Sequence, residues 1–258
     1  MNDIALITGA TAGIGRATAL LLARNEYDVI ITGRRSELLD KLELEIRSKT
    51  SSEVLSLCFD VRDRKAVESA VKSIPENWKS IHILVNNAGL AAGFSSIHEG
   101  DIDDWEQMID TNIKGLLYIT RAISPGMVDR KAGHIINIGS IAGKEVYEKG
   151  NVYCSTKFAV DALTRGMRTD LVDYGIKVTA IHPGMVDTEF SIVRFKGNKK
   201  KAARVYDGLT PLYDNDIAEA VLFAVSRPPH VNINDMLIMP TAQASATKTI
   251  RHLRSKKK

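Results

Sequence analysis

The chain has 258 residues, of which 44% are hydrophobic, and this length and composition suit one sizeable core. Its net charge of +4 comes from residues 248–258, which hold six Lys/Arg and no acidic residue. Residues 1–247 have 29 basic and 31 acidic residues, a net charge of −2, so the body of the chain has no basic surplus to attract nucleic acid.

Two further features bear on where the protein works. No apolar run is long enough to cross a bilayer, and the N-terminus lacks the regions of a secretion signal. Cys58 and Cys154 lie far apart without metal-ligand spacing, which suits a reducing cytoplasm. We expect a cytoplasmic protein with no membrane or nucleic-acid partner. The basic segment 248–258 is expected to be a solvated, mobile end, with a partner contact as the alternative.

Apolar, β-branched runs alternate with stretches of helical periodicity along the whole chain. The runs predict strands at 4–8, 29–32, 54–59, 81–85, 135–138, 178–181 and 236–239. The periodicity predicts helices at 16–24, 36–48, 64–73, 105–123, 152–173 and 214–226. Most strands are apolar throughout, which is typical of strands buried on both faces. The sequence therefore predicts a Rossmann-type, doubly wound α/β fold: one domain, residues 1–247, with a seven-stranded parallel sheet and helices on both faces.

A glycine cluster follows the first predicted strand, at the edge of the sheet where such folds bind ligands. Gly9, Gly13 and Gly15 permit a tight turn and a close approach of the backbone to a pyrophosphate. The amides at the start of the next helix would face that anion. An ordinary glycine-rich turn is the alternative, but the position between strand and helix favours a dinucleotide site.

The residues after the second strand predict which dinucleotide binds. NAD-binding proteins place an Asp or Glu there, which accepts a hydrogen bond from the ribose 2′-hydroxyl. This chain has Arg34 and Arg35 instead, and arginine pairs with the 2′-phosphate of NADP. We predict NADP as the cofactor, preferred at least about tenfold. Two solvated arginines at a helix start are the alternative.

Two later strand ends extend the predicted site. After the third strand, Asp60 is able to accept a hydrogen bond from the adenine amino group or, alternatively, to cap the following helix. Residues 86–89, Asn-Asn-Ala-Gly, follow the fourth strand. Their small members let the backbone pass beside the cofactor, and the asparagines are expected to tie neighbouring strands together.

Tyr153 and Lys157 stand one helical turn apart and are the most informative pair in the chain. A phenol has an ordinary pKa of about 10, and a nearby ammonium lowers it into a useful range. Ser140, after the fifth strand, is able to donate to a substrate carbonyl. Asn112 lies in a helical stretch where an amide is disfavoured, which suggests a polar role such as holding a water in a proton relay. Singly, both residues are more often structural; together with the pair they predict coupled proton and hydride transfer.

Along nearly its whole length the chain resembles the short-chain dehydrogenase/reductases. The resemblance rests on the glycine cluster, residues 86–89, Pro183-Gly184, and the set Asn112, Ser140, Tyr153 and Lys157. It implies that Tyr153 is the general acid/base and that Lys157 lowers its pKa and binds the nicotinamide ribose. It also implies that Ser140 polarises the reacting oxygen and that Asn112 completes the relay. The implied cofactor site is Gly9, Thr11, Ala12, Gly13, Ile14, Gly15, Arg34, Arg35, Asp60, Val61, Asn87, Ala88, Gly89, Tyr153, Lys157, Pro183, Gly184, Val186 and Thr188.

Two segments, residues 188–197 and 231–243, resemble a narrower group, the NADP-dependent 3-hydroxy acid dehydrogenases. This resemblance implies oxidation of the 3-hydroxyl of serine, allo-threonine or 3-hydroxypropionate, and the reverse carbonyl reduction. It also implies a homotetramer. No metal is expected, since Tyr153 and Ser140 polarise the reacting oxygen. The segment 248–258 departs from the group's pattern.

Residues 187–210 form a long, basic segment that we expect to be a lid over the substrate. Arg194, between Val193 and Phe195, is the candidate to pair with a substrate carboxylate, beside Ser140 and Tyr153. A solvated charge is the alternative for Arg194.

We therefore predict an NADP-dependent oxidoreductase of small 3-hydroxy acids. The main alternative is a short-chain reductase of another carbonyl substrate, such as a 3-oxoacyl thioester or a sugar. A cofactor-sensing scaffold without turnover and an interaction protein that acts through its basic tail are further alternatives. The complete catalytic set argues against the scaffold.

Overall fold

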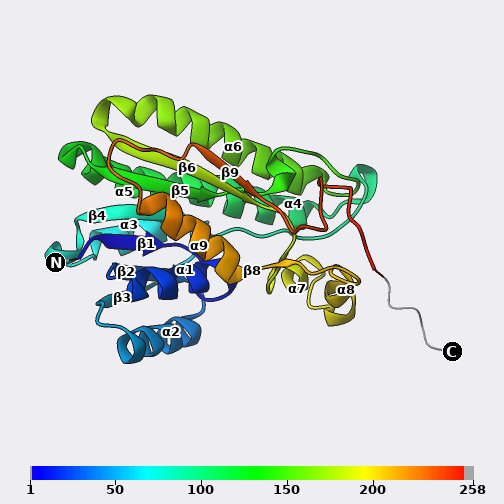
Figure 1. Ribbon diagram of the computed structural model, residues 1–258, viewed down its shortest axis with the longest axis horizontal. Helices are drawn as coiled ribbons and strands as arrows, with labels where there is room; N and C mark the ends of the chain where they lie inside the picture. Colours follow the sequence, from blue (N-terminus) through cyan, green and yellow to red (C-terminus); the bar gives the residue numbers. More distant parts are fainter. Residues whose placement is uncertain (1, 253–258) are drawn as a thin grey trace.

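The computed structural model describes residues 2–252 and has a seven-stranded sheet at its centre (Figure 1). The strand order is β3-β2-β1-β4-β5-β6-β9, and every neighbouring pair is parallel. The strands are β1 (Ile4–Ile7), β2 (Asp28–Gly33), β3 (Val54–Cys58), β4 (Ile81–Asn86), β5 (Gly133–Ile138), β6 (Ile176–Pro183) and β9 (Asp235–Ile238). The chain changes direction across the sheet between β1 and β4, where ligands of such folds bind. The predicted Rossmann-type fold is confirmed.

Helices cover both faces of this sheet (Figure 1). One face carries α1 (Gly13–Arg24), α2 (Ser36–Lys49) and α9 (Asp214–Val225), and the other carries α3 (Arg64–Lys72), α5 (Leu116–Arg130) and α6 (Asn151–Leu171). Successive strand residues serve the two faces in turn: Ala5 and Ile7 belong to the first core, and Leu6 to the second. Because both faces are covered, the strands must be apolar throughout, as their sequences are.

The stretch predicted at 105–123 is helical throughout, but it is not one uniform α-helix, because the structure has three segments there. α4 (Ile102–Ile109) runs into a π-helical turn, Asp110–Gly115, which continues into α5. A π-helical turn holds an extra residue and often marks a functional site. Asn112 lies within it and is 2% exposed. Hydrophobic periodicity alone does not reveal such a turn.

Asp63, and not Asp60, caps α3. The Asp63 carboxylate accepts hydrogen bonds from the backbone amides of Lys65 and Ala66. The alternative role considered for Asp60 as a helix cap is therefore wrong. Its carboxylate instead accepts from the guanidinium of Arg62, at 2.7 Å for the shorter contact.

The segment after β6 leaves the sheet and forms a small unit at its edge (Figure 1). It consists of β7 (Val186–Asp187), α7 (Phe190–Arg194), α8 (Lys199–Arg204) and β8 (Leu212–Tyr213), and β7 pairs with β8. The chain then returns to this unit, where the His252 amide donates to the Gly208 carbonyl. Of the tail expected to be a solvated end, residues 248–252 are largely exposed but hydrogen-bonded to the rest of the chain, and residues 253–258 lie outside the described part.

Within residues 2–252, none of the helices combines the length and the apolar character that a bilayer crossing demands.

A buried histidine in β5 makes the stability of the fold depend on pH. His134 is buried, and its Nε2 lies 2.8 Å from the Thr179 hydroxyl. Burial lowers the pKa of His134 from 6.5 to about 3, so the folded protein keeps this ring neutral. The unfolded chain takes up the proton below about pH 6.5, and stability present above that pH is lost as the pH falls towards 3.

We predict that His134→Gln removes part of this acid sensitivity, because glutamine keeps a donor near Nε2 and does not titrate. Between pH 6.5 and pH 5 the wild type should lose about 2 kcal/mol more unfolding free energy than the variant. Urea denaturation at the two pH values measures the difference. Equal pH dependence in the two proteins would contradict the assignment.

Candidate active site

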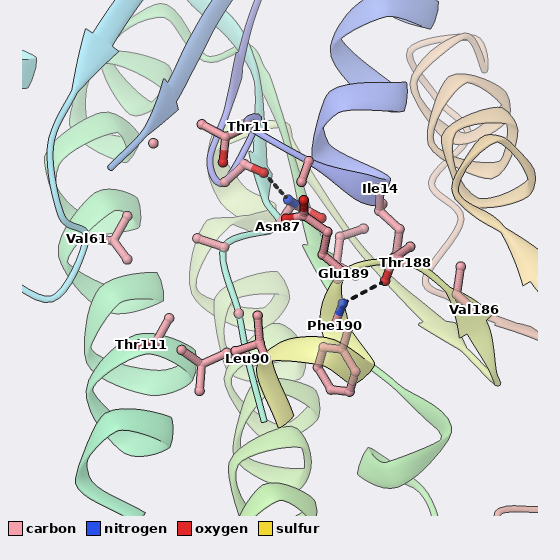
Figure 2. A pocket seen from close by; sticks show the side chains of 18 of the residues that line it. Thr11, Ile14, Val61, Asn87, Leu90, Thr111, Val186, Thr188, Glu189 and Phe190 are labelled. Carbon is pink, nitrogen blue, oxygen red and sulfur yellow. Dashed lines mark hydrogen bonds between the residues drawn. The ribbon is translucent and has the colours of Figure 1, made fainter. Parts of the chain in front are cut away.

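A cavity of about 360 Å³ opens at the carboxyl ends of the central strands. Nearly all of the predicted site lines it: Gly9, Thr11, Ala12, Gly13, Ile14, Arg34, Arg35, Asp60, Val61, Asn87, Ala88, Gly89, Ser140, Tyr153, Lys157, Pro183, Gly184, Val186 and Thr188. Figure 2 shows Thr11 and Ile14 from the glycine loop across from Glu189 and Phe190 of the segment after β6. Gly15, Asn112 and Arg194 do not line it. Its size is within the usual range for small-molecule sites.

The glycine loop is shaped by backbone geometry that only glycine adopts easily. Gly9 and Gly13 have φ values of 67° and 51°. A Cβ on Gly15 would lie 2.4 Å from the Gly9 carbonyl oxygen, so the loop closes tightly upon itself. No side chain caps the start of α1, which leaves its first amides available to an anion. The loop thus fits a dinucleotide pyrophosphate.

The asparagines after β4 hold this loop in place. The Asn87 amide donates to the carbonyls of Thr8, at 2.8 Å, and Gly9, at 3.2 Å. The buried Asn86 amide donates to Asn137 of β5 at 2.8 Å. The prediction that these residues tie strands together is confirmed.

The two arginines at the end of β2 lie at the rim of the cavity, each with a partner. Arg35 donates to the Thr11 hydroxyl at 2.9 Å and to Glu189 at 3.0 Å. Arg34 Nη1 lies 3.6 Å from Asp60 Oδ2. Burial raises the pKa of Asp60, but hydrogen bonds from Arg62 outweigh this and hold that pKa below its usual value. Two half-exposed guanidinium groups at this rim fit a phosphate dianion.

The predicted catalytic side chains meet at the inner end of the cavity, and burial dominates their chemistry. Tyr153, Lys157 and Ser140 are all buried. Burial lowers the pKa of Lys157 to about 8, and its ammonium donates to the Ile138 carbonyl at 2.9 Å. Burial also raises the pKa of Tyr153 well above its ordinary value; a hydrogen bond with Ser140 opposes this rise.

The expected lowering of the Tyr153 pKa by Lys157 is not seen in this structure. The groups that lower this pKa are Ser140 and Arg194, and they do not offset the loss of solvation. Spacing along a helix predicts that the two side chains share one face of it, but not how little solvent reaches them.

Asn112 is joined to the site through the backbone of the loop after β4. Its amide nitrogen donates to the Leu90 carbonyl at 2.8 Å and to the Thr156 hydroxyl at 2.9 Å. Its amide oxygen accepts from the Leu90 amide at 2.8 Å. A Cβ on Gly89 would lie 3.2 Å from Asn112 Oδ1 and 3.5 Å from Lys157 Nζ, so glycine lets these two residues flank the chain. Both amide hydrogens of Asn112 are thus engaged, and the acceptor site left on its side chain is the second lone pair of Oδ1.

Arg194, at the end of α7, lies beside the cavity within a group of aromatic rings. Its guanidinium carbon is 5.3 Å from the ring centroids of Phe94 and Tyr153 and 5.5 Å from that of Tyr147. It donates to the Tyr147 hydroxyl. Within residues 2–252, its Nε is buried without a hydrogen-bond partner, and no carboxylate forms an ion pair with it.

Sequence reasoning missed several residues of the cavity wall. Leu90, Thr111 and Ile138 lie next to predicted residues, whereas Glu189, Phe190 and Val193 belong to the segment after β6. Leu90, Thr111 and Ile138 could have been predicted only because they are neighbours of motif residues in the sequence. The other three reach the cavity because the segment with α7 folds over it, which the sequence does not show.

Comparison with known proteins decides the family. The sequence pattern described as "short chain dehydrogenase" matches residues 3–199. This chain belongs to the short-chain dehydrogenases. It is 49% identical over 94% of its length to the "NADP-dependent 3-hydroxy acid dehydrogenase YdfG" of Salmonella typhi, and the match covers 97% of that relative. It is 42% identical to the "NADP-dependent 3-hydroxy acid dehydrogenase" of Schizosaccharomyces pombe, over 95% of both chains.

Solved structures agree with these relatives. The closed form of serine dehydrogenase complexed with NADP+ superimposes with a TM-score of 0.91 at 46% identity, over 96% of this chain and 99% of that one. The serine dehydrogenase of Escherichia coli gives a TM-score of 0.81 at 43% identity, over 93% of this chain and 99% of that one. The resemblance predicted from the sequence, both to the family and to the narrower group, is confirmed.

Proposed function

We propose that this short-chain dehydrogenase oxidises the 3-hydroxyl of small 3-hydroxy acids with NADP and catalyses the reverse carbonyl reduction. The observation that carries the proposal is one cavity joining a pyrophosphate loop and two arginines to Ser140, Tyr153 and Lys157. The names of its relatives support both the cofactor and the substrate class. NADP, when bound, supplies the hydride acceptor.

The residues of the chain provide the proton chemistry. Because burial raises the pKa of Tyr153, the phenol keeps its proton at neutral pH and is ready to act as the acid in carbonyl reduction. In alcohol oxidation it must first lose that proton, which the hydrogen bond from Ser140 and the nearby Arg194 guanidinium would favour. The Ser140 hydroxyl accepts a bond from the Ala142 amide at 3.1 Å, so its own proton remains available to the reacting oxygen. Asn112 would complete the proton relay by holding a water that passes the proton from Lys157.

A substrate panel with NADP tests the function directly. The panel comprises 3-hydroxypropionate, 3-hydroxyisobutyrate, serine and both diastereomers of threonine, followed through NADPH absorbance. We expect oxidation of at least one of them, and Tyr153→Phe should lower kcat about 100-fold or more because its acid/base group is gone. NADPH binding by the variant serves as the folding control. Activity confined to acyl thioesters or sugars would instead favour the alternative reductase.

The arginines at the rim are proposed to select NADP over NAD. We predict that Arg35→Ser weakens NADPH binding by about 10- to 150-fold, as expected for one charge-assisted contact of about 1.5–3 kcal/mol, and leaves NADH binding unchanged. Arg47→Ser is the matched control, since Arg47 is an equally exposed, ion-paired arginine on α2. Fluorescence titration measures both affinities. An equal loss for NADH and NADPH would show that Arg35 does not read the 2′-phosphate.

The segment 187–210 is proposed to act as the substrate lid, with Arg194 as its carboxylate-binding residue. Arg194 is half-buried, its Nε is buried without a hydrogen-bond partner, and within the described residues no carboxylate pairs with it. It lies beside the Tyr153 ring, so a carboxylate bound to it would place a small hydroxy acid next to the proposed acid/base.

We predict that Arg194→Ala lowers kcat/KM for the preferred 3-hydroxy acid, because its charge pair with the substrate carboxylate is lost. The loss of transition-state stabilisation, calculated from the ratio of the two kcat/KM values, should be about 2–5 kcal/mol. Turnover of a neutral alcohol of similar size should change much less. Lys200→Ala, in the exposed part of the same segment, is the control. An unchanged kcat/KM for the acid would remove Arg194 from this role.

We also propose that the protein is a cytoplasmic homotetramer. The described surface has exposed apolar side chains on two separate faces, with Leu117 and Phe158 on one and Phe223 and Leu237 on the other. Two self-complementary faces are what a tetramer with twofold axes requires. A molar mass of one chain by light scattering would refute it.

A further inference from the structure

A cluster of charged side chains lies behind the catalytic residues, outside the cofactor cavity. The ammonium of Lys144 is 2.8 Å from Asp161 Oδ1 and 2.7 Å from Asp235 Oδ2. The imidazole of His182 faces the same two carboxylates, with its Nε2 at 3.5 Å and 3.3 Å from them. His182 is fully buried. None of these four side chains has a part in the mechanism above.

The cluster connects the elements that carry the catalytic residues. Lys144 follows Ser140 by four residues, and Asp161 follows Lys157 by one turn of α6. His182 and Asp235 belong to β6 and β9, which neighbour each other in the sheet (Figure 1). The ion pairs therefore hold the Ser140 loop against the helix of Tyr153 and Lys157.

His182 contacts the Ser140 segment directly. Its Nδ1 lies 3.2 Å from the Ser140 carbonyl oxygen. A carbonyl oxygen only accepts hydrogen bonds, so Nδ1 carries the hydrogen in this contact. Burial lowers the pKa of His182, although the nearby carboxylates of Asp235 and Asp161 raise it, and the ring is neutral. A Cβ on Gly139 would lie 2.3 Å from Nδ1, so a glycine is needed next to Ser140 for the ring to approach.

The same carbonyl also accepts from the Gly143 amide at 2.8 Å, which closes the turn at Ser140. The backbone conformation of Ser140 is thereby fixed from two sides, by the turn and by the imidazole. The direction of its hydroxyl depends on that backbone. A small displacement of a group that positions the reacting atoms costs much of the rate.

We propose that His182, packed between the Ser140 carbonyl and the ion-paired side chains of Asp161, Lys144 and Asp235, is a positioning residue that sets the Ser140 hydroxyl for catalysis. This inference rests on the proposed function of Ser140 and concerns how the chain holds that residue. Asp161, His182 and Asp235 also resemble a metal-ligand set. The Lys144 ammonium, however, already lies between the two carboxylates where a cation would bind.

Two substitutions of His182 separate positioning from packing. The amide nitrogen of asparagine falls near the place of Nδ1, and that of glutamine falls near Nε2. His182→Gln should lower kcat about tenfold or more and leave the Kd for NADPH unchanged. His182→Asn, which keeps the donor to Ser140, should restore kcat to within about threefold of the wild type. Equal kcat in the two variants, or a changed Kd for NADPH with kcat intact, would overturn the proposal.

The matched control is His134→Gln, which alters another buried histidine, on the adjacent strand and away from the cavity. It should shift the melting temperature without lowering kcat. If His134→Gln lowers kcat as much as His182→Gln does, the effect is one of general stability and the inference is wrong. Turnover should also survive treatment with a metal chelator; loss of turnover would assign the cluster to a metal instead.

A measurement without turnover keeps this test independent of the proposed substrate. Long-range 1H–15N correlation of histidine-labelled wild type should show His182 as the neutral tautomer with hydrogen on Nδ1, and the His182→Asn spectrum assigns the signal. If no 3-hydroxy acid is oxidised, the proposed function fails, and the kinetic comparison moves to whichever alcohol the enzyme does oxidise. A tautomer with hydrogen on Nε2 alone would overturn the positioning role, whatever the substrate.

Discussion

The active site depends on a few buried hydrogen bonds that lock the carboxyl ends of β1, β4 and β5 together. The Asn87 amide holds the two carbonyls at the end of β1, and the Thr8 hydroxyl accepts from the backbone amides of Asn87 and Ala88, both at 3.0 Å. One strand further on, Asn86 bonds to Asn137. A buried polar group left without its partner costs about 1–3 kcal/mol, so each strand end resists moving alone. The glycine loop after β1 and the loop after β5 that carries Ser140 therefore keep a fixed distance across the cavity.

Loss of solvation sets the chemistry of the two central groups. It raises the pKa of Tyr153 and lowers that of Lys157 to about 8, and both shifts disfavour the charged form. The pocket thus favours a neutral phenol, and any charge that develops there must be stabilised by fixed dipoles such as the Ser140 hydroxyl. In such a dry site, fixed hydrogen-bond donors are worth more than they are in water. This places a high demand on the orientation of Ser140, and the buried His182 behind it meets that demand.

Local patterns predicted what depends on local sequence, and they failed where tertiary contacts decide. The apolar runs predicted the strands, and the glycine loop, Arg34 and Arg35 were found because each follows a strand end. The π-helical turn at Asn112 was missed because hydrophobic periodicity indicates that a stretch is helical but not which backbone hydrogen bonds it forms. Asp60 was considered as a helix cap because it lies between a strand and a helix, but Asp63, three residues later, takes that place. The raised pKa of Tyr153 and the contact between His182 and Ser140 depend on packing between segments far apart in the chain, which no motif encodes.

The segment after β6 is held in place by contacts of residues that lie next to the guanidinium of Arg194. Lys196 is 2.9 Å from Asp101 and 3.0 Å from Asp104, and the Arg194 carbonyl accepts from the Gly93 amide at 3.1 Å. These contacts hold α7 in place without using the Arg194 guanidinium. The aromatic rings around that guanidinium offset part of its desolvation through cation–π attraction but do not neutralise it. A bound carboxylate would neutralise it, whereas a neutral alcohol would leave this half-buried charge uncompensated. Preference for an acid over a neutral alcohol can therefore come from the cost of that uncompensated charge as much as from a new attraction.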